Sequence, residues 1–142
     1  MNKLQRLLVL TVCVTGFSYV PVIEPIANAQ SDQAIERSSE QALDRAERLN
    51  QQANELYKQG RYVYAIPFDE VSLSIIETFL GPDHPHVATS LNNLALLYRL
   101  QGNYVKALPL YERALSIYET LLVPYHPHVA TSLNNLAGLY QD

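Results

Sequence analysis

Apolar residues recur at every third or fourth position over most of the chain, which is the spacing of amphipathic helices. Residues 38–59 follow this pattern with alanine and leucine and contain neither glycine nor proline, so they are predicted to form one long helix. A second helix is predicted over residues 62–79. Gly60 lies between the two, where a left-handed conformation closes a helix, and Gly81 with Pro82 ends the second helix.

The same pair of helices is predicted again in the next part of the chain. The first begins at Pro85, because proline fits the first turn of a helix, and runs to about residue 100. The second runs from residue 103 or 104 to about residue 122, and Gly102 separates the two. Two helices joined by about three residues pack antiparallel. The residues predicted to face inward are Val87, Leu91, Leu94, Ala95 and Tyr98 on the first helix and Ala107, Leu108, Tyr111, Ala114, Leu115 and Tyr118 on the second.

A direct repeat accompanies these helices. The stretch HPHVATSLNNLALLY begins at His84 and returns at His126, 42 residues later, with Leu96 replaced by Gly138. A repeat of this length indicates stacked units that each bury an apolar face only against a neighbour. We predict repeats over about residues 47–82 and 87–124 and a half repeat over residues 127–142. The leucines of the half repeat are expected to form an uncovered apolar face through which the chain self-associates.

Residues 1–29 have the pattern of a cleaved secretory signal peptide. Lys3 and Arg6 precede an apolar run, and Ala27-Asn28-Ala29 offers the small residues that a signal peptidase accepts. The alternative is an uncleaved membrane anchor, although the run is barely long enough to span a bilayer and is interrupted by glycine and proline. We therefore expect a domain over residues 30–142 in the periplasm or outside the cell, with membrane contact only if the signal is retained.

The composition argues against several classes of function. The formal net charge is −4 and basic residues alternate with acidic ones, whereas a nucleic-acid-binding protein needs a clustered basic face. Cys13, the only cysteine, lies in the leader, which leaves the mature chain without a disulfide or a thiolate metal site. The sequence has no nucleophile elbow, phosphate-binding glycine loop or pair of catalytic carboxylates. We therefore predict no enzymatic activity and no cofactor.

Two His-Pro-His triplets, which begin at His84 and His126, raise the question of a metal site. Each pair of histidines flanks a proline at a predicted helix start, and no acidic or cysteine ligand stands at the same spacing in both copies. Stacked repeats hold the two pairs roughly 10 Å or more apart, too far to share one ion. The triplets are therefore interpreted as helix starts, and no metal site is predicted.

These residues resemble the tetratricopeptide repeat, in the 42-residue variety found in kinesin light chains and in many bacterial arrays. The resemblance covers about residues 49–140 and includes the DHP that begins at Asp83 and the LNNLA that begins at Leu91. It implies an all-α fold of antiparallel helix-turn-helix repeats, stacked as a short right-handed α-solenoid of two repeats and a terminal half repeat. The first repeat departs from the family pattern at Gln52 and Asp69, where a large apolar or aromatic residue is expected.

An asparagine recurs at one position of each first helix, as Asn50, Asn92 and Asn134. In the family that the chain resembles, this helix lines a concave groove in which asparagine amides hold an extended peptide, since an amide both donates and accepts hydrogen bonds. The alternative for the adjoining Asn93 and Asn135 is a bond to a neighbouring helix. The groove residues that the resemblance implies are Asn50, Asn54, Tyr57, Lys58, Thr89, Asn92, Asn93, Leu96, Arg99, Thr131 and Asn134.

The function expected from these patterns is an exported interaction module that binds a peptide or partner protein in this groove. Nucleic acid is not an expected partner. The alternative is a truncated or oligomerising fragment of a longer repeat array that has no ligand of its own.

Overall fold

The computed structural model of the chain describes residues 24–122 and 126–141. It divides the chain into two units, Met1–Gln33 and Ala34–Asp142. In the first unit the described residues, 24–33, are helical. Most of the predicted signal peptide therefore lies outside the described residues, and the predicted repeats lie in the second unit. Among the described residues, no helix combines the length and the apolar composition of a membrane span.

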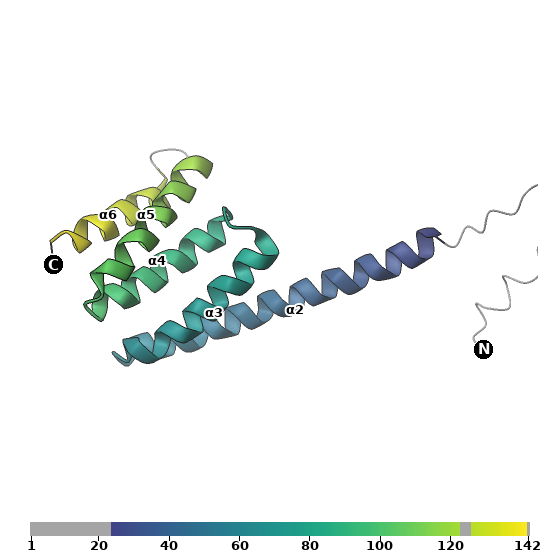
Figure 1. The fold of residues 1–142 in the computed structure, drawn as a ribbon, viewed down its shortest axis with the longest axis horizontal. Helices are drawn as coiled ribbons and strands as arrows, with labels where there is room; N and C mark the ends of the chain where they lie inside the picture. The colour runs from purple at the N-terminus through teal and green to yellow at the C-terminus, as the bar shows by residue number, and fades with distance from the viewer. Residues whose placement is uncertain (1–23, 123–125, 142) are drawn as a thin grey trace, which may run out of the picture. The chain divides into compact units, whose positions relative to one another are not determined.

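Five helices make up the described part of the chain, and it contains no strand (Figure 1). Helix α2 begins well before the predicted residue 38, because the residues upstream include the helix formers glutamine, alanine and glutamate and no glycine. Helices α3, α4 and α5 begin and end within two residues of their predicted bounds, and α6 begins at the predicted residue 127. The bounds are α2 Glu24–Lys58, α3 Tyr62–Leu80, α4 Pro85–Leu100, α5 Tyr104–Leu121 and α6 Pro127–Leu139.

Glycine closes the first helix of each pair, as predicted. Gly60 and Gly102 have φ angles of 71° and 79°, in the left-handed region that favours glycine. The residue after each glycine donates its backbone N–H back into the last turn, from Arg61 to the Leu56 carbonyl at 2.9 Å and from Asn103 to the Tyr98 carbonyl at 2.8 Å. These bonds satisfy carbonyls that the helix itself leaves unpaired. Each tight turn then reverses the chain into the second helix.

The His-Pro-His triplets start α4 and α6. The imidazole Nδ1 of His84 accepts a hydrogen bond from the backbone N–H of His86 at 3.2 Å, and His126 does the same for His128. The proline between them occupies the first turn of its helix, where the missing N–H costs nothing. The first histidine of each triplet therefore caps a helix, in agreement with the sequence interpretation.

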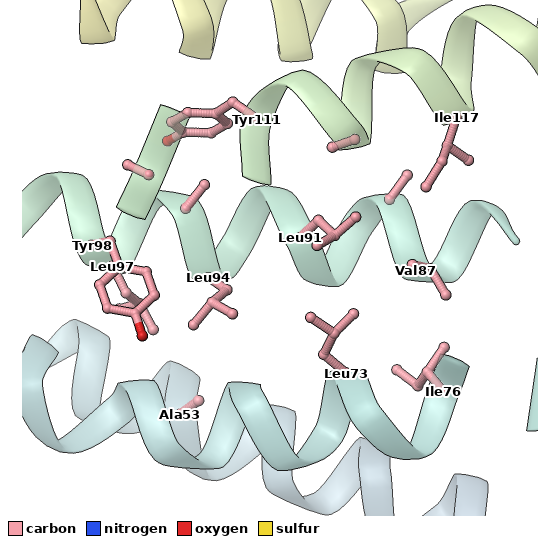
Figure 2. Packing of buried hydrophobic residues seen from close by; sticks show 14 of the residues in the cluster. Ala53, Leu73, Ile76, Val87, Leu91, Leu94, Leu97, Tyr98, Tyr111 and Ile117 are labelled. Carbon is pink, nitrogen blue, oxygen red and sulfur yellow. The ribbon is translucent and has the colours of Figure 1, made fainter. Parts of the chain in front are cut away.

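Helix α4 lies at the centre of the repeats, between α3 and α5 (Figure 1). All five of its predicted inward residues are buried. Figure 2 shows Leu73 and Ile76 of α3 pointing toward α4. Ala95 of α4 and Ala107 of α5 have no exposed surface, which fits the need for small side chains where helix axes approach closely.

Helix α6 packs on α5 and α4 through part of its apolar surface. Val129 and Leu139 are buried, whereas Leu133 is 48% exposed and Tyr140 is 71% exposed. Leu133 is one of the leucines that the sequence analysis expected on an uncovered face, and the structure places it at the surface together with Tyr140. An apolar strip on α6 is consequently in contact with solvent.

Candidate peptide-binding groove

A groove runs between α2 and α4 and contains two hollows. The first hollow has a volume of about 330 Å³ and the second a volume of about 460 Å³. Glu47, Asn50 and Asn93 line both hollows, so the two form one continuous surface, here called the α2/α4 groove. Pockets that hold small ligands have volumes from about 300 Å³ upward. Each hollow is therefore large enough to receive a side chain of a partner.

Four amide side chains line the first hollow. Asn50, Gln51 and Asn54 come from α2 and Asn93 comes from α4. None of the four makes a hydrogen bond to another residue in the described part of the chain. Each amide has donors and an acceptor that match those of a peptide backbone. The hollow can thus bind main-chain N–H and C=O groups from both of its walls.

A buried carboxyl group also lines the first hollow. Asp69 of α3 is only 6% exposed and makes no hydrogen bond or ion pair within the described residues. Burial raises the pKa of this carboxyl to about 7, because desolvation disfavours the charged form. The sequence already marked Asp69 as a departure from the family pattern, and the same position of the second repeat holds Tyr111. That departure marked an unusual position of the repeat, and only the structure places it in the groove.

The charge of the first hollow is entirely acidic. Glu47 and Asp69 line it, and none of the lining residues is basic. The neighbouring Glu70 has a different role, since its Oε1 accepts a hydrogen bond from the Tyr98 hydroxyl at 2.5 Å. Burial and this bond to Glu70 raise the pKa of Tyr98 to about 12. The first hollow therefore favours a cationic or hydrogen-bonding ligand over an anionic one.

The structure brings six of the eleven predicted groove residues to the α2/α4 groove and places five elsewhere. Those in the groove are Asn50, Asn54, Tyr57, Asn93 and Leu96 in the first hollow and Thr89 in the second. Those that line neither hollow are Lys58, Asn92, Arg99, Thr131 and Asn134. The recurrence of asparagine along the sequence is thus a weaker guide to the groove than the direction in which each helix face points.

Asn92 holds two helices together instead of lining a hollow. Its Nδ2 donates to the hydroxyl of Ser132 at 2.9 Å, and Ser132 has no exposed surface. The sequence interpretation placed both Asn92 and Asn93 in the groove, with an interhelical bond as the alternative for Asn93. The structure has Asn93 in the groove and gives the interhelical bond to Asn92. The physical reason is that adjacent residues on a helix point about 100° apart. Asn92 faces α6 and Asn93 faces α2.

Three of the other four predicted residues outside the hollows have contacts of their own. Lys58 pairs with Glu55 at 2.9 Å at the surface of α2. The Thr131 hydroxyl donates to the Pro127 carbonyl of its own helix at 2.9 Å. A Cβ atom on Gly138 would lie 2.8 Å from Nη1 of Arg99, so the glycine leaves room for this guanidinium against α6. Asn134 is exposed on α6.

Histidines line part of the second hollow. The rings of His84 and His86 stack with their centroids 5.1 Å apart, and both line this hollow. Within residues 24–122 and 126–141, no group of three or more histidine, cysteine or acidic side chains could hold a metal ion. The histidines therefore contribute stacked rings and a helix cap to the groove.

The chain was also compared with known proteins. A family model of the tetratricopeptide repeat matches residues 44–120 and residues 93–142. The comparison with curated proteins finds no match. The two family matches together extend from α2 to the end of the chain and overlap across α4 and α5. Because they span well over half of the sequence, and because the helices stack in antiparallel pairs as an all-α solenoid, the chain belongs to the tetratricopeptide repeat family.

Proposed function

We propose that the chain binds an extended segment of a partner protein in the α2/α4 groove. Tetratricopeptide repeats are protein-interaction modules, and this proposal names the surface that makes the contact here. The observation that carries it is the set of four amides in the first hollow that have no partner among the described residues. Their donors and acceptors can grip a peptide backbone with little regard for its sequence.

The place of this function in the cell is part of the same proposal. The charged start, apolar run and Ala27-Asn28-Ala29 ending support export by a cleaved signal peptide. The 42-residue period supports a place among the longer, kinesin-light-chain-like repeats. Mass spectrometry of the protein recovered from the exported fraction should find a chain that begins at Gln30. A chain that retains Met1 would show that the leader is not cleaved.

The neighbouring asparagines of α4 provide a matched test of the groove. Peptides are selected from a random library displayed on phage, and the affinity of the best binder is then measured for each variant. Asn93→Ala removes one exposed amide from the first hollow, so it should weaken binding by about 1 to 3 kcal/mol and leave the melting temperature almost unchanged. If Asn93→Ala keeps full affinity, or if the chain binds no peptide, the groove assignment is wrong.

Asn92→Ala is the control, and it should have the opposite effect. This variant leaves the buried Ser132 hydroxyl without its partner, which should destabilise the fold by about 1 to 2 kcal/mol. The affinity of the folded fraction should stay as in the original chain, because Asn92 lines neither hollow. Weaker binding by the folded fraction of this variant would show that the peptide contacts the side of α4 that faces α6.

The exposed apolar strip on α6 supports the second candidate, an oligomerising fragment without a ligand of its own. Leu133 and Tyr140 are large apolar residues at the surface of this helix. Monomeric proteins rarely expose large contiguous apolar patches. Sedimentation velocity over a range of concentrations distinguishes the candidates. Self-association that Leu133→Gln abolishes, together with no peptide binding, would favour the second.

A further inference from the structure

The first hollow holds a charged group that the binding of a peptide backbone does not use. Asp69 is more than nine-tenths buried, lines the hollow and has no hydrogen bond or ion pair within the described residues. Burying a carboxyl group without a partner is costly, and buried charges in proteins are usually paired. Nothing in the packing of α3 requires an acid at this position, since the second repeat accommodates the buried Tyr111 there. The missing partner is therefore expected to come from a ligand.

The surroundings of Asp69 select the kind of ligand. A second acid, Glu47, lines the same hollow, and no basic side chain does. Tyr57 lines it as well and is 38% exposed, so its ring is open to contact from outside the chain. An aromatic face attracts a cation, and a carboxylate beside it supplies the countercharge. An anionic ligand would face two acids and no cation.

We propose that the first hollow receives a lysine or arginine side chain of the bound peptide, with Asp69 as its countercharge. The inference rests on the proposed peptide-binding function and adds the chemical class of the residue that the groove selects. The ammonium or guanidinium group pairs with the Asp69 carboxylate at the base of the hollow. The amides of Asn50 and Asn93 hold the peptide backbone on either side. The volume of about 330 Å³ accommodates the long side chain of either residue.

Binding of a cation is coupled to the proton on Asp69. Only the ionised carboxylate pairs with the cation, and in the free protein this carboxyl has a pKa of about 7. Affinity for a basic peptide should therefore rise between pH 5.5 and pH 8, by no more than about 10-fold, as the fraction of ionised Asp69 increases and the amides hold the peptide backbone at both pH values. Besides Asp69, the ionisable residues that line the first hollow are Glu47 and Tyr57, both from α2. The residues of α4 that line it have no ionisable side chain. Glu70 of α3 is bonded to Tyr98.

The test uses synthetic octapeptide pools with acetylated and amidated ends. One position is fixed as lysine, arginine, glutamine or glutamate, and the others vary among alanine, serine, threonine and glutamine. Fluorescence anisotropy gives the affinity of the full chain for each pool at pH 5.5 and pH 8. At pH 8 the lysine and arginine pools should bind about 10-fold more tightly than the glutamine pool, as expected for a charge-assisted hydrogen bond. The glutamate pool should bind most weakly.

Two variants separate the role of Asp69 from a general effect of charge. Asp69→Asn keeps the shape of the side chain and should abolish both the preference for basic pools and its dependence on pH. Glu70→Gln removes the same charge from the adjacent residue outside the hollow and should keep both. His84 and His86 of the second hollow are present in the original chain and in both variants. Their effect on the pH dependence of the affinity is therefore the same in all three proteins and cancels in the comparison.

The outcomes distinguish this inference from the proposed function. Equal binding of the glutamine, lysine and arginine pools would refute the role of Asp69 and leave the peptide groove in place. A preference for basic pools that persists in Asp69→Asn would assign the countercharge to another residue and would also refute the inference. If none of the pools binds, the proposed function and this inference fail together.

Discussion

Replacing Asp69 by asparagine should make the protein more stable at pH 8, by roughly 2 to 4 kcal/mol. The carboxyl is buried, and its pKa in the folded chain is about 7, compared with an ordinary value of 3.8. The folded state therefore binds this proton more tightly than the unfolded state does. The free energy of unfolding should fall as the pH rises from about 4 to about 7 and then level off, because the charged carboxylate is desolvated only in the folded chain.

The most specific test is how the difference in stability between the original chain and Asp69→Asn changes with pH. Near pH 4.5 the carboxyl is neutral in the folded protein and ionised mainly in the unfolded chain, so the original chain should be less stable than Asp69→Asn by only about 1 kcal/mol. At pH 8 the two proteins should differ by the full difference of roughly 2 to 4 kcal/mol. Urea denaturation at several pH values measures the two curves. Glu70→Gln alters the exposed acid next to Asp69. Its free energy of unfolding should change with pH as that of the original chain does. A difference that stays constant from pH 4.5 to pH 8 would contradict the raised pKa.

The stabilising substitution is expected to impair function. Asp69→Asn removes a charge that weakens the fold, and the same charge is the proposed countercharge for a basic peptide. Binding sites often retain polar groups that the fold alone does not favour. A variant that gains stability and loses its preference for basic peptides would link the two properties in one residue.

Leu91→Ala should destabilise the protein by about 2 to 5 kcal/mol, whereas Leu133→Ala should cost less than about 1 kcal/mol. The two leucines occupy the same position of the repeated stretch, one period apart, and most of their neighbours in sequence are identical. Leu91 has no exposed surface, while Leu133 is 48% exposed. Leu91 lies on α4 between α3 and α5 (Figure 2), so its truncation leaves a cavity in the core. Truncation of Leu133 at the surface leaves little empty space.

Urea denaturation of both variants tests this pair. The repeated stretch is its own control for local effects, because the change in helix propensity is the same at both positions. A similar loss of stability in the two variants would mean that α6 packs far more tightly than its exposed surface indicates. It would also remove the observation that favours self-association through this helix.

Much of the fold follows from local patterns that the sequence displays directly. The bounds of α3 to α5 and the start of α6 were predictable because glycine, proline and the capping histidines mark helix ends through the conformations that they allow. The inward face of α4 was predictable because apolar residues recur with the period of a helix. These signals depend on a few neighbouring residues, so they are readable without knowledge of the rest of the chain. The start of α2 carries a similar mark in Pro25, but this proline lies within the predicted signal peptide.

The sequence by itself thus determined the helices, their turns and the repeat, and the tertiary structure decided which side chains form the site. Asn92 and Asn93 are the same residue type in one helix, yet the first bonds to α6 and the second lines the groove. Asp69 reads as an irregular repeat position until α2 and α4 enclose it in the first hollow. The physical reason is that burial, hydrogen bonding and pKa depend on neighbours that are distant in sequence, and identical stretches acquire different neighbours when the helices stack.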